Sequence, residues 1–303
     1  MNVPRLVLPV SVAIPTYRRE RVLLETLDYL LALELAPAEI IVVDQTLDHE
    51  AATTERLSSL DSKGRIRWIK LDTPSITHAM NQALLAAKED IVLFVDDDIR
   101  PEPDLIAAHY SVYQQHADCM VAGRVIQPWE EDREYSSSTH SQFASLMPSE
   151  VKEFIGCNFS LPRKAAISLG GFDENFVKVA YRYEAEFSHR FIASGNRISF
   201  EPKACLHHLK DAGGGTRSFG EHLTTWRPDH AVGAYYFALR TKPNGRWLKD
   251  FISRPMRALM TRHHLRRPWW IPTTLIAELR GMFWALSLNR HGPRFVKPDT
   301  DHA

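Results

Sequence analysis

The chain of 303 residues contains only three cysteines, and no two of them form the closely spaced pairs that bind zinc or carry redox chemistry. Cys119, Cys157 and Cys205 are far apart and lie among apolar residues, so we expect reduced, buried thiols in a cytosolic protein. A net charge is also lacking, because Lys plus Arg and Asp plus Glu both total 37. This balance argues against overall attraction to nucleic acid or to an acidic partner.

Long apolar runs are absent as well. We find no stretch of 18 or more apolar residues free of charge and proline, which argues against a membrane-spanning helix. The opening MNVPRLVLPVSVAIPTYRRE does not combine a basic segment, a long apolar segment and a small-residue cleavage site, so it does not read as a signal peptide. Its apolar run predicts a first strand, and we expect a cytoplasmic protein.

In the first half, short apolar runs rich in β-branched residues alternate with segments of helical periodicity. Strands are predicted over 10–16, 39–45, 65–72 and 91–95, and helices over 22–31, 76–90 and 103–116. This order is typical of an α/β fold with a mainly parallel central sheet flanked by helices. Ligands bind such sheets at the carboxyl ends of the strands, so the chemistry should collect after Ile14, Val43 and Val95.

The second half is less regular. Strands are predicted over 119–129, 155–163 and 196–209, with a helix over 183–194 and a polar surface loop over 130–142. The stretch DAGGGTRSFGEH, residues 211–222, has the composition of a mobile segment.

The stretch IVLFVDDDIRPEPD, residues 91–104, leads an apolar strand directly into three carboxylates. Because side chains alternate along an extended chain, Asp96 and Asp98 should share a face while Asp97 points the other way. Two ionised carboxylates on one face repel each other, and a divalent cation or a set of N–H donors would relieve that repulsion. Oxygen ligands of this kind suit Mg²⁺ or Mn²⁺. The alternative is an acidic loop that caps the following helix.

Several motifs occur together in one order: VSVAIPTYRRERVLLETLDYLL, EIIVVDQT, VLFVDDD, LGGFDENF and YEAEFSHRFIASGNRISFEPKACLHHL. With them, residues 9 to about 210 resemble the family 2 glycosyltransferases, inverting nucleotide-sugar enzymes of the GT-A fold. The resemblance implies transfer of a sugar from a nucleoside diphosphate sugar, with UDP- or dTDP-sugars favoured, to a hydroxyl of a glycan or lipid-linked acceptor. Assembly of a cell-surface polysaccharide is one setting for such a transfer.

The resemblance also implies a set of donor-binding residues: Pro15, Thr16, Arg18, Asp44, Asp96 and Asp97. Asp44 would accept the N3–H of uracil or thymine, although it could instead cap the loop that follows it. The glycine-rich segment contains Arg217. This arginine would bind phosphate when the segment closes over the donor, or it is simply part of a flexible linker.

The Asp-x-Asp motif implies a divalent cation, Mn²⁺ or Mg²⁺, held by Asp98 and Asp96 with His208 completing the shell. The neighbouring His207 is the weaker match, and a strand-end histidine can also be a surface group. Glu184 would be the general base, with Glu186 as the less favoured alternative. Glu186 and Arg190 are four residues apart on the predicted helix, an ordinary ion-pair spacing.

Three features depart from the family pattern. Tyr183 and Glu184 stand where Glu-Asp is usual, Met80 replaces an arginine, and Gln45 follows the base-reading aspartate. Asp173 is a candidate acceptor contact, but a turn or capping role competes and is favoured.

Two other interpretations of the function remain open. A sugar nucleotidyltransferase fits less well, because no glycine-rich phosphate loop lies near the first strand. The second alternative is a binding protein that kept the fold and lost catalysis.

The C-terminal part is basic: residues 254–297 hold nine Arg or Lys residues and one acid, Glu278. An amphipathic helix is predicted to carry one apolar face, made of Leu275, Ile276, Leu279, Met282, Phe283 and Leu286. Such a helix suits peripheral contact with an anionic membrane, although packing on the catalytic domain or a second subunit is the favoured alternative. Nucleic acid is not expected as a partner, because no recognised binding motif accompanies the charge.

Taken along the chain, these patterns predict a catalytic domain over 1–210, a flexible segment with a helix over 211–253, and a basic helical tail over 254–303.

Overall fold

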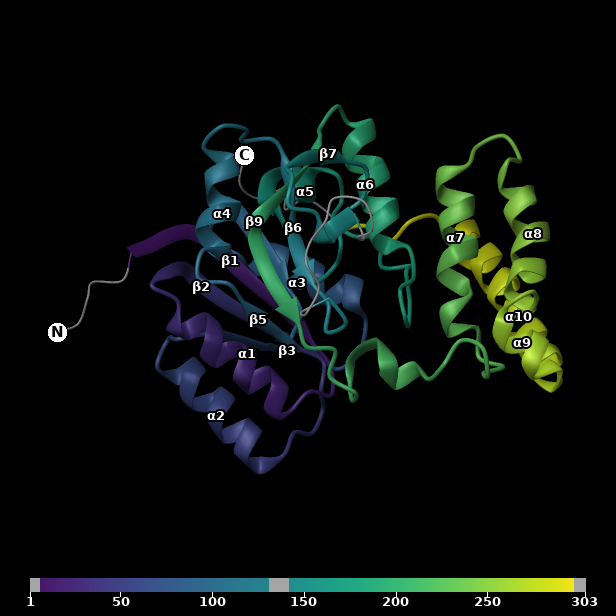
Figure 1. Ribbon diagram of the computed structural model, residues 1–303, viewed down its shortest axis with the longest axis horizontal. Helices are drawn as coiled ribbons and strands as arrows, with labels where there is room; N and C mark the ends of the chain where they lie inside the picture. The colour runs from purple at the N-terminus through teal and green to yellow at the C-terminus, as the bar shows by residue number, and fades with distance from the viewer. Residues whose placement is uncertain (1–5, 131–141, 297–303) are drawn as a thin grey trace.

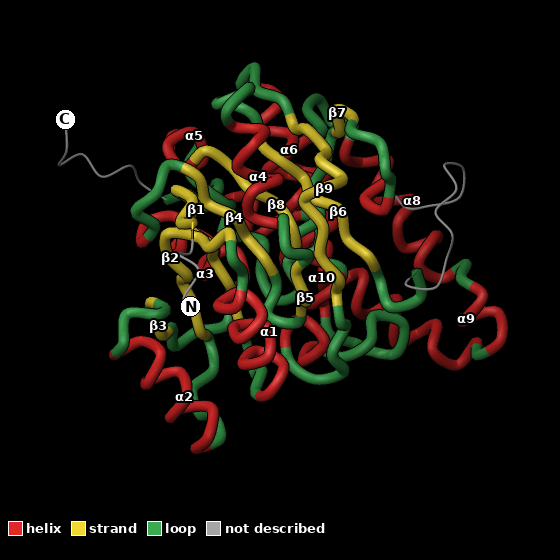
Figure 2. Tube along the Cα trace, turned by 60° about the vertical axis from the view of Figure 1, so that its left-hand side comes forward, coloured by secondary structure: helices red, strands yellow, loops and turns green. Residues whose placement is uncertain are grey.

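A computed structural model describes residues 6–130 and 142–296 of the chain. Within these residues, nine strands form one sheet that crosses the middle of the molecule (Figure 2). The strands are β1 (Leu6–Thr16), β2 (Leu35–Asp44), β3 (Arg67–Lys70), β4 (Ile91–Val95), β5 (Ile99–Pro101), β6 (Met120–Ile126), β7 (Ser149–Val151), β8 (Asn158–Pro162) and β9 (Ile198–His208).

The sheet has a parallel half and a mixed half. Strands β3, β2, β1 and β4 are neighbours in this order and pair in parallel. Beyond β4 the order continues through β8, β6, β9 and β5: β8 is antiparallel to β4 and β6, β6 and β9 are parallel, and β5 is antiparallel to β9. The predicted parallel arrangement therefore holds for the first half, and its strand ends meet at one edge.

Helices cover both faces of the sheet (Figure 1). The helices are α1 (Arg21–Ala32), α2 (Ala51–Ser62), α3 (Ile76–Ala86), α4 (Leu105–Tyr113), α5 (Arg163–Ser168), α6 (Tyr183–Ala193), α7 (Val232–Thr241), α8 (Trp247–Leu259), α9 (Arg262–Arg266) and α10 (Ile271–Arg290). One buried cluster joins the sheet to α1, α2 and α4, and a larger one joins it to α3, α5, α6 and the C-terminal helices. The helix α2 was not predicted.

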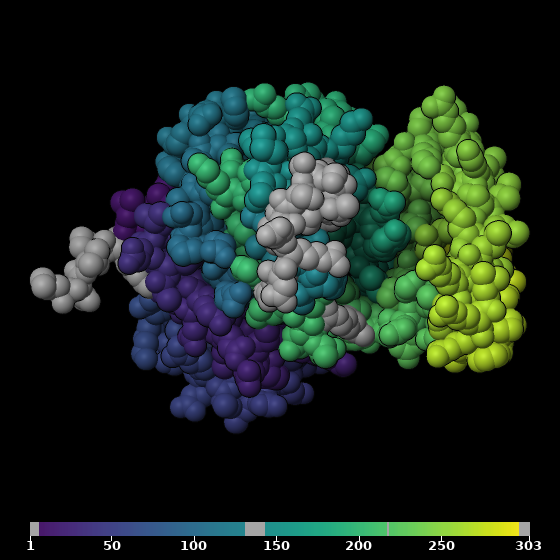
Figure 3. Space-filling view, viewed as in Figure 1, coloured from purple at the N-terminus to yellow at the C-terminus, as the bar shows by residue number. Residues whose placement is uncertain are grey.

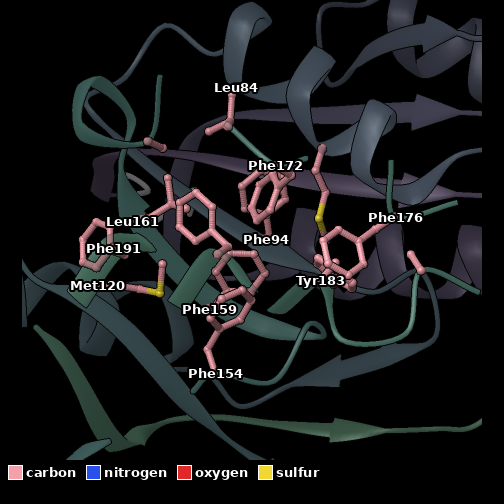
Figure 4. Close-up of a cluster of buried hydrophobic side chains, with 14 of the residues drawn as sticks. Leu84, Phe94, Met120, Phe154, Phe159, Leu161, Phe172, Phe176, Tyr183 and Phe191 are labelled. Carbon is pink, nitrogen blue, oxygen red and sulfur yellow. The ribbon is translucent and has the colours of Figure 1, made fainter. Parts of the chain in front are cut away.

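The larger cluster is rich in aromatic rings (Figure 4). Phe94 of β4 stacks on Phe159 of β8, with ring centres 5.0 Å apart. Phe172 lies edge-on to Phe94 and 4.6 Å from Phe187 of α6. Burial of rings in such arrangements stabilises both layers. The cluster thereby fixes α6 against β4, the strand that leads into Asp96.

The C-terminal helices α7 to α10 stand beside the sheet, yet their core is continuous with it (Figure 1). In α7, Gly233 approaches the backbone of Tyr181 so closely that a Cβ would lie 2.3 Å from its carbonyl oxygen. After α10 the chain returns to the turn that follows α5, where the Val296 N–H donates to the Gly170 carbonyl. None of the described helices combines the length and apolar character needed to cross a bilayer.

The C-terminal helices differ in detail from the predicted tail. The boundary expected after residue 253 falls inside α8. The apolar face predicted for α10 is divided, because Met282 and Leu286 pack on the core whereas Ile276 and Phe283 are exposed. The more pronounced apolar stripe lies on α8.

Candidate active site

A cavity of about 270 Å³ lies at the carboxyl ends of β1 and β4. It is lined by residues from six parts of the chain: Pro15, Thr16, Tyr17 and Arg19; Gln45; Pro74, Ser75 and Ile76; Asp96, Asp97 and Asp98; Lys178; and His208, Lys210, Gly215, Thr216 and Phe219. The cavity thus gathers four of the predicted donor residues, Pro15, Thr16, Asp96 and Asp97, with the predicted metal ligands Asp98 and His208.

Arg19 is buried among the aspartates that follow β4. Its Nε lies 3.1 Å from Asp97 Oδ1, and its Nη2 donates to Asp98 Oδ2 at 3.2 Å. Asp97 also accepts a hydrogen bond from Thr16 Oγ1 at 2.7 Å. Arg18, which the sequence favoured, is exposed, and its guanidinium lies over the Tyr17 ring. Sequence reasoning missed Arg19. The sequence did contain a signal for Arg19, because two successive arginines in the Tyr-Arg-Arg-Glu turn must point in different directions.

Asp96, Asp98 and His208 come together at the cavity. His208 Nε2 lies 3.1 Å from Asp98 Oδ1 and 3.7 Å from Asp96 Oδ2, as expected if these aspartates share a face. Asp96, His208 and Cys157 form a group whose potential ligand atoms lie within 4.8 Å of one another. His207, the weaker sequence match, points elsewhere and contacts Glu102 at 2.8 Å.

The three aspartates experience different environments. Burial raises the pKa of Asp97 to about 7, although Arg19 and Thr16 oppose that shift. Burial acts on Asp98 in the same direction, but His208, Arg19 and the Asp211 N–H outweigh it and lower the pKa of Asp98. Burial also raises the pKa of Asp96, against the attraction of His208. Asp98 is therefore the best-stabilised anion of the three.

The glycine-rich segment after β9 packs directly over the first turn of the chain. Arg19 Nη1 donates to Asp211 Oδ1 at 2.8 Å and to the Gly213 carbonyl, and the Gly215 N–H donates to the Tyr17 carbonyl at 2.7 Å. Gly214 has φ +67°, and a Cβ there would lie 2.2 Å from the Arg18 carbonyl oxygen. Glycine is thus required for this close approach. Arg217 falls in the following 3₁₀ turn (Gly215–Phe219), and its side chain is outside the described part of the structure.

Asp44 ends β2 and is completely buried. Its Oδ1 accepts from the Thr46 N–H at 2.9 Å, and its Oδ2 contacts Trp68 Nε1 at 2.9 Å and His49 Nε2 at 2.7 Å. Burial disfavours the charged imidazole, but hydrogen bonds to Asp44 and Glu20 prevail and raise the pKa of His49. His49 was not predicted from the sequence, where it is a single loop histidine. Asp44 does not line the cavity, although the next residue, Gln45, does.

Glu184 lies in the first turn of α6, beside Gly156, where an added Cβ would be 3.1 Å from Glu184 Oε1. Burial raises the pKa of Glu184 to about 7, and the nearby charge of Asp96 raises it further, whereas Arg182 lowers it. Glu186 is engaged differently, because both of its oxygens bind Arg190 at 2.7 and 2.8 Å. That pair is the predicted i, i+4 contact, and it leaves Glu184 as the less committed carboxylate.

Asp173 lies between the sheet and the C-terminal helices and is 1% exposed. Its oxygens accept from Tyr236 Oη at 2.7 Å and from the backbone N–H groups of Asn175 and Arg294 at 3.0 Å. These bonds match the turn and capping role that competed with an acceptor contact.

Comparison with known proteins identifies the class that this fold and cavity define. Residues 11–172 match the sequence profile of Glycosyl transferase family 2, so the chain belongs to that family and is a glycosyltransferase. A relative in Haloferax volcanii, glucosyl-dolichyl phosphate glucuronosyltransferase, is 26% identical over 220 residues, which cover 66% of this chain and 68% of the relative.

Solved structures share the GT-A fold at low sequence identity. The S. aureus TarS fragment 1–349 with UDP-GlcNAc has a TM-score of 0.60 and 17% identity, covering 92% of this chain and 88% of the fragment. The mannosyltransferase PcManGT of Pyrobaculum calidifontis, with GDP-Man and Mn²⁺, has a TM-score of 0.56 and 18% identity, covering 95% and 80%. GalNAc-T7 with UDP, GalNAc and Mn²⁺ has a TM-score of 0.56 and 13% identity; the alignment covers 81% of this chain but 54% of GalNAc-T7. The expected GT-A fold is confirmed.

Proposed function

We propose that the protein transfers a sugar, with inversion, from a nucleoside diphosphate sugar to a hydroxyl group of a glycan or lipid-linked acceptor. The observation that carries this proposal is the cavity where Thr16, Asp96 and His208 meet at the strand ends. The nucleotides named in the complexes of the solved relatives support a nucleotide-sugar donor. We favour a UDP- or dTDP-sugar, because two of the solved relatives were obtained with UDP or UDP-GlcNAc, and uracil and thymine present the same N3–H to a protein.

The side chains that could bind a metal fit a hard divalent cation. Asp96 and Asp98 offer carboxylate oxygens, and His208 offers an imidazole whose Nε2 faces both carboxylates. We propose that these three side chains hold Mn²⁺ or Mg²⁺; two of the solved relatives were obtained with Mn²⁺. When bound, the cation would stabilise the negative charge that develops on the departing diphosphate.

We assign the general base to Glu184. Its carboxylate would remove the proton from the acceptor hydroxyl while that oxygen attacks the anomeric carbon, so that one displacement inverts the configuration. The pKa of about 7 lets Glu184 exist partly ionised near neutral pH and still be basic enough to accept a proton. Its electrostatic coupling to Asp96 is consistent with a position beside the donor.

A lipid-linked acceptor is supported by the name of the Haloferax volcanii relative, which acts on a glucosyl-dolichyl phosphate. Peripheral membrane contact of a cytoplasmic enzyme is part of this proposal. On α8, Leu248, Ile252 and Met256 are at least half exposed at helical spacing, and Met260 follows at the end of the helix. Several exposed basic residues belong to α8 and α9 or lie next to them in the chain: Arg246, Lys249, Arg257, Arg262, Arg266 and Arg267. Such a face suits an anionic lipid surface.

The test incubates the purified protein with Mn²⁺ or Mg²⁺ and a panel of UDP-, dTDP- and GDP-sugars, and identifies the phosphate product by mass spectrometry. Metal-dependent release of a nucleoside diphosphate is expected, and it should be lost in Asp98→Asn but retained in the control Asp104→Asn, an exposed residue before α4. Release of pyrophosphate from a sugar phosphate and a nucleoside triphosphate would instead identify a nucleotidyltransferase. Donor binding without turnover in the presence of hydroxyl acceptors would favour a binding protein.

A further inference from the structure

A second, larger cavity of about 730 Å³ lies among the C-terminal helices. Its walls come from α7, α8 and α10, from Tyr181 and Arg182 before α6, and from the loop over 222–230. Figure 3 shows these helices beside the rest of the molecule, with a notch between the two at the upper edge of the view. Its volume falls in the range of small-molecule binding sites.

The lining of this cavity is strongly cationic. The cations in the wall are Arg182, Arg227, Lys242, Arg254 and Arg257, and the carboxylates are Asp250 and Glu278. Both carboxylates are already neutralised. Lys242 lies 2.5 Å from Asp250, and Arg254 lies 3.1 Å from Glu278, which also accepts a hydrogen bond from Tyr235. The remaining arginines give the cavity an excess of positive charge.

Two of these arginines are available to a ligand. No carboxylate among the described residues lies within ion-pair distance of Arg227, which is exposed. Arg182 has only a long contact, 3.7 Å, with Glu153, and its guanidinium is held 5.6 Å from the ring centre of Phe237, another lining residue. Burial lowers the pKa of His222 in the same wall, and the charges of His230 and Arg254 lower it further, as expected where positive charge is in excess.

Two short segments of the chain contribute residues to both cavities. Lys178 and Phe219 line the donor cavity, and Tyr181 and His222, three residues further along each segment, line the cationic one. Glu184 follows Arg182 on the same turn, and its carboxyl interacts electrostatically with both Arg182 and Asp96. A molecule anchored in the cationic cavity could therefore extend toward the carboxylate that we assign as the base.

We propose that this cationic cavity binds the acceptor through a phosphate group, held by Arg182 and Arg227. Arginine suits this role because its planar donors match phosphate oxygens in pairs. The inference rests on the glycosyl transfer proposed above and adds the chemical class of the acceptor. The phosphate belongs either to a lipid carrier or to a soluble phosphorylated glycan.

Calorimetry with inorganic pyrophosphate tests the site directly. The protein is kept in EDTA, so that no divalent cation supports phosphate binding in the donor cavity. Arg182→Gln and Arg227→Gln should each weaken binding about tenfold, as expected for loss of one charge-assisted contact. Arg266→Gln, an exposed arginine outside the lining, is the matched control and should bind like the wild type. Equal affinity in all four proteins would overturn the proposal. Arg227 is exposed, so its replacement should leave folding intact, which thermal melting checks.

Competition experiments then distinguish the two possible sources of the acceptor phosphate. Displacement of pyrophosphate at lower concentration by farnesyl phosphate than by glucose 1-phosphate assigns a lipid carrier, and the reverse order assigns a soluble glycan. Displacement by neither overturns an acceptor role. The two proposals fail separately. Metal-dependent hydrolysis of the donor by the wild type reports on the donor cavity and does not require the cationic cavity, so its absence would count against the proposed function alone.

Discussion

The Nη2 atom of Arg19 lies 3.2 Å from Oδ2 of Asp98, so a side chain just after β1 neutralises a carboxylate just after β4, 79 residues later in the chain. Arg19 also contacts Asp97 and Asp211, and all of these groups except Asp211 are largely shielded from water. The contact joins the donor cavity to the glycine-rich segment that covers it.

Removal of Arg19 should destabilise the protein. In Arg19→Met the buried carboxylates of Asp97 and Asp98 lose their compensating charge, and breaking a buried pair in this way costs about 3–5 kcal/mol. Urea unfolding measures the change in the free energy of unfolding. Arg18→Met is the control, because Arg18 is exposed, and it should change stability by about 0.5 kcal/mol or less. Similar values for both variants would contradict a neutralising role for Arg19.

Glu184→Gln should slow transfer strongly while leaving donor binding intact. The amide cannot accept the hydroxyl proton, and loss of a general base lowers kcat by about 10²–10⁴-fold. Steady-state kinetics with the donor found in the panel measures kcat, and calorimetry measures the donor Kd. Glu153→Gln is a suitable control, since Glu153 is a nearby, more exposed carboxylate. Unchanged turnover in Glu184→Gln would place the base elsewhere.

The pH dependence of the reaction should follow the same carboxyl group. Burial raises the pKa of Glu184 to about 7, and the base must be ionised, so kcat/KM should fall as the pH falls through 7. Well below this pKa, each further unit removes about nine-tenths of the remaining ionised form. The acidic limb, measured from pH 5 to 9 with the metal saturating, should be absent from the residual activity of Glu184→Gln. A limb that persists in the variant would belong to another group.

Gly214→Ala should prevent the glycine-rich segment from closing over Arg19. The backbone at 214 has φ +67°, and the new methyl group would lie 2.2 Å from the Arg18 carbonyl oxygen. We expect a loss of about 1–3 kcal/mol of stability and an increase in the KM for the donor. In the control Gly213→Ala, the nearest atom to the new Cβ is 3.6 Å away, so little change is expected. Equal KM values would argue against a role for this closure in donor binding.

The apolar stripe on α8 should bind anionic membranes. Ile252 is 72% exposed, and Ile252→Glu places a charge in the middle of the stripe. Co-sedimentation with phosphatidylglycerol vesicles should fall at least severalfold relative to the wild type, because the charge opposes both insertion and attraction. Leu47→Glu, at an exposed leucine beyond β2, is the control. If the wild type does not bind these vesicles, the proposed membrane contact is wrong.

The sequence predicted the parallel half of the fold and much of the donor cavity, because both depend on local patterns. Apolar runs that end in polar residues identified β1, β2 and β4, and strand alternation predicted that Asp96 and Asp98 share a face, which in the structure is turned toward His208. Other features depend on partners distant in the sequence. Arg18 and Arg19 are equivalent in a sequence pattern, but only Arg19 turns inward toward the aspartates. His49 gained its role only through contact with Asp44.

The sequence by itself determined the family, the alternation of strands and helices, and the position of the carboxylates at a sheet edge, since hydrophobic periodicity and motif order are properties of neighbouring residues. The tertiary structure alone decided which basic side chains meet those carboxylates, how the glycine-rich segment closes, and that the C-terminal helices enclose a cationic cavity beside Glu184. These features arise from packing between segments far apart in the chain, and the spacing of residues along the sequence does not encode the direction in which a side chain meets a distant partner.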